Sequence, residues 1–85
     1  MKLELRFFAS LREALGTSQE TIEIPETVKT VSQLRAHLNA RGGVWAEALA
    51  EGKSLRCALN QTIVDANTAL IDGAEAAFFP PVTGG

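Results

Sequence analysis

Apolar and polar side chains alternate in two stretches near the N-terminus. In residues 2–8 and again in residues 19–24, nearly every second residue is apolar and most of those between are charged or polar. Successive side chains of a strand point to opposite faces, so this period of two is typical of a half-buried strand. We therefore predict a strand in each stretch. The inward set in the first strand would be Leu3, Leu5 and Phe7.

The pattern changes to a helical period in residues 30–41. Thr30 and Gln33 are spaced for a capping box, in which each side chain bonds the other residue's amide. Gly42 and Gly43 follow as a stop signal. We predict one amphipathic helix here, which would cover one face of a sheet. Its apolar stripe is formed by Val31, Leu34 and Leu38.

Two shorter helices are also predicted. Ser10 precedes an apolar residue and has Glu13 three positions later, so it is expected to cap a short helix that Gly16 ends. The second piece covers residues 44–50, in which two large apolar side chains are four positions apart.

Three further strands are predicted in the second half of the chain. Asn60 and Gln61 separate two of them as a turn, and Asp72 with Gly73 is a strong turn signal before the last. The predicted strands cover residues 55–59, 62–64 and 75–79.

This order of elements predicts an α+β domain, a ubiquitin-like β-grasp with a mixed sheet and one main helix packed on one face. The domain is expected to span residues 1–79. Residues 80–85 then form an extended C-terminal arm that ends in Gly-Gly.

Composition narrows the possible partners. The chain has 85 residues, enough for one core, and its 46% hydrophobic and 21% charged residues are typical of a folded domain. The net charge is −2 and the eight basic residues are scattered, which argues against nucleic acid as a ligand. Residues 1–10 lack the continuous apolar stretch of a signal peptide or membrane span, so a cytoplasmic protein without a membrane partner is expected.

The C-terminal arm has the composition expected of a working segment. Two prolines favour an extended backbone, and at roughly 3.3 Å per residue six residues reach about 20 Å. The two glycines would let the end of the chain enter a channel too narrow for other residues. Gly-Gly alone is a weak signal, because many passive tails end in glycine. The arm consists of Pro80, Pro81, Val82, Thr83, Gly84 and Gly85.

Chemistry at a C-terminal carboxylate requires activation, because its leaving group would be oxide. A mixed anhydride with AMP, made from ATP, is the plausible activated form, after which sulfur can replace oxygen. The resulting thiocarboxylate is a soft nucleophile that a partner enzyme can hold beside its substrate. Such a domain needs no catalytic side chains of its own.

The residues resemble the MoaD family, the small subunits of molybdopterin synthase. The likeness is strongest in FFPPVTGG, residues 78–85, and in RFFASLRE, residues 6–13, and it extends through the whole chain. It implies a sulfur carrier whose Gly85 is adenylated, converted to a thiocarboxylate and used to donate sulfur to cyclic pyranopterin monophosphate, building the molybdopterin dithiolene. Pro80 to Gly84 would enter the large subunit, which supplies the catalytic residues.

The resemblance also implies a set of partners. These are the large subunit, in an assembly of two small and two large subunits, an adenylyltransferase similar to the ubiquitin-activating enzyme, and a sulfur donor protein. ATP would be used by the activating enzyme, and no cofactor or metal bound to the chain itself is expected.

Aromatic residues at the ends of the first and last predicted strands indicate a docking surface. In each adjacent pair, Phe7 with Phe8 and Phe78 with Phe79, one ring must point to each side of the sheet. We predict that Phe8 and one of Phe78 and Phe79 lie on the uncovered face near two arginines. The partner-binding set is Phe8, Phe78, Phe79, Arg6 and Arg56; the alternative is an apolar patch without a partner.

Other reactive side chains have simpler interpretations. His37 has no second ligand at metal-binding spacing, and Cys57 alternates with leucines as a buried apolar residue would. Asp65 and Asp72 lie in predicted turns, where short carboxylates accept backbone hydrogen bonds.

Three other functions fit parts of this pattern. A sulfur carrier for thiamine biosynthesis or tRNA thiolation would have the same fold and also end in Gly-Gly. A ubiquitin-like modifier would join its C-terminus to lysines of target proteins. A passive interaction domain would retain its activity without Gly84 and Gly85.

Overall fold

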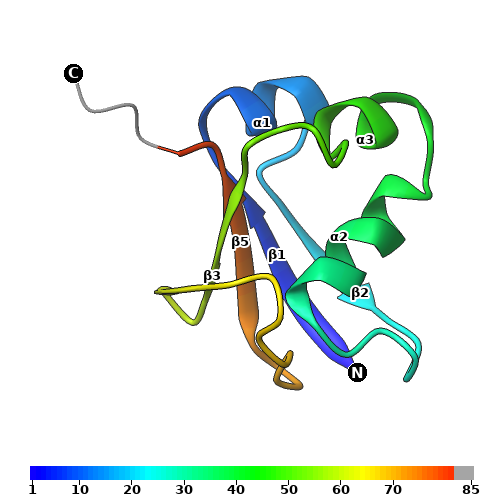
Figure 1. The fold of residues 1–85 in the computed structure, drawn as a ribbon, viewed down its shortest axis with the longest axis vertical. Helices are drawn as coiled ribbons and strands as arrows, with labels where there is room; N and C mark the ends of the chain where they lie inside the picture. Colours follow the sequence, from blue (N-terminus) through cyan, green and yellow to red (C-terminus); the bar gives the residue numbers. More distant parts are fainter. Residues whose placement is uncertain (82–85) are drawn as a thin grey trace.

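The computed structural model describes residues 1–81 of the chain, and Figure 1 shows how its helices and strands are arranged. Three helices and five strands lie in the described part. In chain order they are β1 (Lys2–Phe7), α1 (Ala9–Leu15), β2 (Gln19–Glu23), α2 (Val31–Asn39), α3 (Gly43–Ala48), β3 (Arg56–Leu59), β4 (Thr62–Val64) and β5 (Glu75–Phe79).

The strands form one mixed sheet in the order β2-β1-β5-β3-β4. β1 and β5 run parallel and the other pairs are antiparallel, so the last strand of the chain is the central strand of the sheet. The buried face of the sheet packs against leucines of α1 and α2 and against Leu49 after α3. This arrangement confirms the predicted α+β β-grasp. The buried residues of its central strands include Leu3, Leu5, Phe7, Cys57, Leu59, Ala76 and Phe78.

Helix α2 begins as the capping pattern predicted. The Thr30 hydroxyl accepts a hydrogen bond from the Gln33 amide at 3.2 Å, and Gln33 Oε1 accepts one from the Thr30 amide at 3.2 Å. The helix ends at Asn39, before the two glycines, and Gly42 adopts a φ of 77° as the chain turns into α3. None of the helices within residues 1–81 combines the length and the apolar character that crossing a bilayer requires.

The predicted cap of α1 is wrong. The helix begins at Ala9, so Phe8 occupies the cap position and no side chain caps the helix. The Phe8 amide donates to Phe78 O at 3.3 Å, which holds Phe8 in extended backbone until the helix starts. Ser10 therefore lies inside the first turn, where it cannot act as the cap. The end of the helix at Gly16, with a φ of 73°, is as predicted.

The turn between β3 and β4 is confirmed and fixes their register. Asn60 and Gln61 both have positive φ, 48° and 70°, as a two-residue turn between twisted antiparallel strands requires. This turn pairs Leu59 with Thr62 and therefore Ala58 with Ile63. Asn60 Oδ1 also accepts the Glu75 amide at 3.0 Å, which ties the turn to the start of β5.

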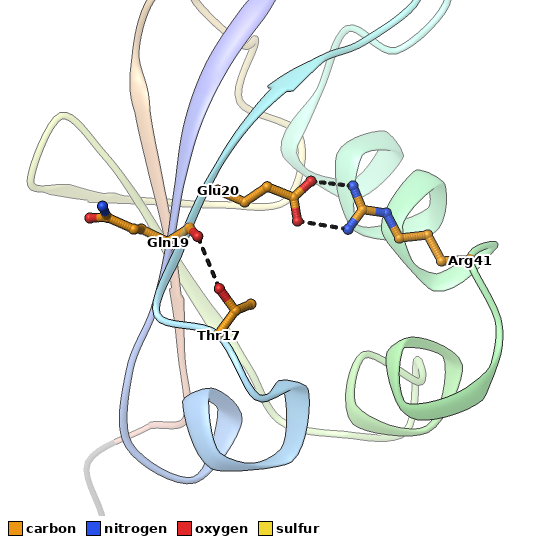
Figure 2. A network of polar contacts seen from close by, with 4 residues as sticks. All are labelled: Thr17, Gln19, Glu20 and Arg41. Atoms are coloured by element: carbon orange, nitrogen blue, oxygen red, sulfur yellow. Dashed lines mark hydrogen bonds and ion pairs between the residues drawn. The ribbon is translucent and has the colours of Figure 1, made fainter.

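An ion pair fastens the edge strand β2 to the segment between α2 and α3. Figure 2 shows the Glu20 carboxylate facing the guanidinium of Arg41, with N···O distances of 2.9 and 2.5 Å. Arg41 also lies over the Trp45 ring, 4.4 Å from its centroid. The hydrogen bond from Arg41 lowers the pKa of Glu20. The stabilising effect is therefore present at neutral pH and is lost as the pH falls through that lowered pKa.

Candidate functional site

The predicted arm leaves the domain from the middle of the sheet. β5 is hydrogen-bonded to β1 on one side and β3 on the other, and it ends at Phe79. Pro80 and Pro81 follow and are both half-buried. In Figure 1 the chain leaves β5 at the end of the sheet where α1 lies. The remaining predicted arm residues, Val82, Thr83, Gly84 and Gly85, the last of which is the predicted reactive residue, lie outside the described residues.

The face of the sheet opposite the core carries most of the predicted docking residues. On β1 this outer face is occupied by Arg6, which is paired in register with Ala77 of β5. On β3 it is occupied by Arg56, which is paired with Phe79. Phe8 lies beside the end of β5, and 42% of its surface is exposed. The structure therefore brings Phe8, Phe79, Arg6 and Arg56 to one face, around the root of the arm.

Phe78 does not belong to this surface. Only 1% of its surface is exposed, and its ring stacks on Phe7 with centroids 6.4 Å apart. Adjacent residues of a strand point to opposite faces, so the burial of Phe78 turns Phe79 outward. The alternative left open by the sequence is settled in favour of Phe79, and the inclusion of Phe78 among the partner-binding residues is corrected.

Arg6 is held in place by its neighbours on the outer face. Its guanidinium lies 3.7 Å from a Glu75 carboxylate oxygen and 5.7 Å from the centroid of the Phe8 ring. Both contacts are partly solvent-exposed, so each contributes at most about 1 kcal/mol. Their effect is to orient the arginine beside the phenylalanine ring.

Three apolar residues of the outer face were not predicted. Ala77 and Ala58 are paired across β5 and β3, and Ile63 of β4 is paired with Ala58. The alanines are nearly buried between longer side chains, whereas 62% of the Ile63 surface is exposed. The two-residue turn at Asn60 and Gln61 was the signal that could have found Ile63, because it fixes the pairing of Ile63 with Ala58.

The outer face around the arm thus combines an apolar centre with charged residues at its edge. We define the outer patch as Phe8, Phe79, Ala77, Ala58 and Ile63, with Arg6 and Arg56 beside it. Protein interfaces commonly have such an apolar core and a polar rim. The patch is continuous with the start of the arm, because Phe79 directly precedes Pro80.

The carboxylates of Asp65 and Asp72 accept hydrogen bonds from neighbouring parts of the fold. Asp65 Oδ1 accepts the Asn67 amide at 2.9 Å and the Thr68 hydroxyl at 3.1 Å, as a turn residue does. Asp72 Oδ1 accepts the Lys2 amide at 2.8 Å, which connects the turn before β5 to the start of β1. Both carboxylates therefore stabilise local or tertiary structure.

Cys57 is buried on the core side of β3, as predicted, and burial raises its pKa to about 11. A thiol with this pKa is almost entirely protonated at neutral pH and is a poor nucleophile. Iodoacetamide at pH 8 is expected to leave Cys57 unmodified in the folded protein and to modify it completely in denaturant, as measured by intact mass. Rapid modification in the folded state would contradict this assignment.

Comparison with known proteins agrees with this geometry. The chain is 47% identical over 83 residues to the "Molybdopterin synthase sulfur carrier subunit" of Escherichia coli (strain K12), covering 98% of this chain and 99% of that protein. It is 43% identical, with the same coverage, to the protein of the same name from Haemophilus influenzae. These relatives confirm the resemblance to MoaD proteins.

The chain also resembles a chain of a solved complex. The structure described as "Protein-protein complex of subunit 1 and 2 of Molybdopterin-converting factor from Helicobacter pylori 26695" matches with a TM-score of 0.67 and 30% identity, covering all of both chains. The model of the ThiS family matches residues 5–85, from β1 to the last glycine. The chain therefore belongs to the ThiS family.

Proposed function

We propose that the chain is the sulfur-carrying subunit of a molybdopterin synthase and that it carries the sulfur on the C-terminal carboxylate of Gly85. The observation that carries this proposal is the 47% identity, over nearly the whole chain, to a curated sulfur carrier subunit of that enzyme. The arm sequence FFPPVTGG supports the choice of the C-terminus as the reactive group.

The chemistry takes place in two partner enzymes. In the first, a carboxylate oxygen of Gly85 attacks the α-phosphorus of ATP and pyrophosphate leaves, giving an acyl adenylate. A donor protein then supplies sulfur at the oxidation level of sulfide, which attacks the acyl carbon and displaces AMP, and the chain leaves as a thiocarboxylate. In the large subunit the sulfur passes to cyclic pyranopterin monophosphate, and water restores the carboxylate. Two deliveries complete one dithiolene.

The role of this chain in both steps is to present its arm. Pro80 and Pro81 follow a strand that is paired on both sides, so the arm starts from a rigid base. Holding a reactant in a fixed orientation makes its reaction effectively unimolecular, which is where the chain contributes to the rate. ATP is consumed by the activating enzyme, and the chain itself uses no bound cofactor.

The outer patch is the proposed docking surface for the large subunit and for the activating enzyme. The similarity to a complex of subunits 1 and 2 supports a large-subunit partner. The position of the patch beside the arm supports its use, because a partner that covers Phe8 and Phe79 also meets the start of the arm. Two small and two large subunits would form the complete enzyme.

Replacing Phe8 with aspartate is expected to weaken binding to the large subunit by at least about thirtyfold, as measured by calorimetry, since a buried aromatic anchor contributes about 2 kcal/mol or more. The fold should be retained because Phe8 occupies the N-cap position of α1, where its side chain makes no capping hydrogen bond, and aspartate is a favourable cap residue.

The matched control is Ile71→Asp. Ile71 is also exposed, at 56%, but precedes the Asp72-Gly73 turn at the opposite end of β5 from the arm. It should bind both partners at full strength. Equal binding by the Phe8→Asp and wild-type proteins would show that the outer patch is not the docking surface.

Intact-mass analysis of protein recovered from cells tests the proposed function. A fraction of the chains should be heavier by the difference between one sulfur and one oxygen atom. Oxidation of Met1 adds nearly the same mass, so the extra mass must lie on the C-terminal peptide and must react with iodoacetamide. The loaded protein should then convert the pterin precursor when mixed with the large subunit. Loading followed by transfer to a thiamine precursor or to tRNA, or isopeptide adducts on other proteins, would contradict the proposal.

A further inference from the structure

The connection between α3 and β3 is held by a side chain from a different helix. Arg35 of α2 donates from Nε to Leu49 O at 3.0 Å, and from Nη2 to Ala50 O and to Lys53 O, the latter at 2.8 Å. Asn39, one turn further along α2, also donates to Leu49 O, at 3.1 Å. All of these acceptors are main-chain carbonyls, so α2 fixes the backbone path of residues 49–53.

This connection separates two hollows in the surface. The larger is a groove of about 630 Å³ between α2 and the β4 side of the sheet, and the smaller, of about 250 Å³, lies between α1 and α3. Lys53, Ser54 and Leu55 line both hollows. Residues 53–55 therefore form the wall between them, which we call the ridge.

Each proline of the arm lines one of the two hollows that the ridge separates. Pro80 lines the smaller hollow together with Leu55, and Pro81 lines the larger groove together with Leu55. Neither proline has an amide hydrogen, so neither can be fixed by donating a main-chain hydrogen bond. The surroundings of the prolines therefore matter for the direction of the arm, and Leu55 of the ridge lines the same hollow as each of them.

We propose that Arg35 is a positioning residue for sulfur transfer: by holding the backbone before the ridge, it sets the direction in which the C-terminal arm leaves the domain. The expected effect of Arg35 on the rate of sulfur transfer rests on the proposed function. Four residues follow Pro81, and a fully extended chain of that length spans at most about 13 Å, over which a rotation of roughly 10° at Pro81 would displace the end by about 2 Å. A misplacement of about 1 Å can cost a hundredfold in rate.

Arg35→Gln is the test variant and Arg41→Gln is the matched control. Both replacements remove an arginine that contacts residues distant in the sequence, but Arg41 binds Glu20 and Trp45 and lines neither hollow. Arg35→Lys is the conservative variant. A lysine ammonium lacks the planar fork that reaches several carbonyls at once, so it should not restore the contacts.

The first measurement is sulfur transfer by purified thiocarboxylated variants in single turnover with the large subunit. Arg35→Gln and Arg35→Lys are expected to lower the rate constant by about ten- to a hundredfold while binding to the large subunit changes less than about twofold. The Arg41→Gln protein should transfer sulfur at the wild-type rate even if its unfolding free energy falls as much as that of Arg35→Gln. A wild-type rate in Arg35→Gln, or equal rate losses in the two Gln variants, would overturn the proposal.

The second measurement does not depend on the function. In a Cys57→Ala background, spin labels on cysteines introduced at Glu26 and Thr83 report the distance from the domain to the arm. Arg35→Gln should broaden or shift the distance distribution, and Arg41→Gln should not. Identical distributions in all three proteins would refute the positioning role. A clear shift together with no sulfur transfer by the wild-type protein would instead mean that the proposed function is wrong and that the structural effect of Arg35 stands.

Discussion

One alanine added after Gly85 is expected to abolish formation of the thiocarboxylate. The added residue places the carboxylate about 3.3 Å further along the chain. It also puts a methyl group on the α-carbon next to that carboxylate. If the activating enzyme accepts the arm through a channel that fits only glycine, the new carboxylate cannot reach the α-phosphorus of ATP. Mass spectrometry after incubation with the activating enzyme, ATP and a sulfur donor should detect no sulfur-containing product.

The matched control carries the same alanine before Met1. The N-terminus lies at the opposite end of the sheet from the start of the arm, because β1 and β5 run parallel. This protein should load sulfur at the wild-type rate. An extended C-terminus that still loads sulfur, without being trimmed back to Gly85, would eliminate the arm as the reactive group.

The fold was predictable where apolar residues recur along the sequence with the period of a strand or of a helix. The alternation of Leu3, Leu5 and Phe7 identified β1 and its buried face, and the stripe on residues 30–41 identified α2. Both signals depend on burial of one face, which the final structure preserves. The prediction of Ser10 as the cap of α1 was wrong because the local capping pattern competed with a long-range hydrogen bond between Phe8 and Phe78. Sequence spacing alone does not reveal that bond.

The site was only partly predictable for a related reason. Adjacent phenylalanines require one ring on each face, but the burial of Phe78 against Phe7, a contact between distant strands, is what shows that Phe79 is the outer one. Ile63 and the two alanines of the outer patch belong to three different strands, so their proximity depends on tertiary pairing. The hydrogen bonds of Arg35 to main-chain carbonyls leave no sequence signal, because any residue could supply a carbonyl.

Phe78 and Phe79 give neighbouring positions with opposite roles, which makes them a sensitive test of the whole interpretation. Phe78→Ala is expected to lower the unfolding free energy by about 3–5 kcal/mol, the usual cost of removing a buried phenylalanine ring. A domain of this length has roughly 4–13 kcal/mol of stability in total, so the loss is severe. Urea unfolding followed by the fluorescence of Trp45 measures it, since Trp45 contacts Phe7, which stacks on Phe78.

Phe79→Ala should produce the reverse result. Its ring is half-buried on the outer face, so its removal is expected to cost less than about 1.5 kcal/mol of stability and to weaken binding to the large subunit by about tenfold or more. Under conditions where Phe78→Ala is still folded, its binding should remain close to wild type. If both variants lost stability and binding in the same proportion, the division of β5 into a core face and a docking face would be wrong.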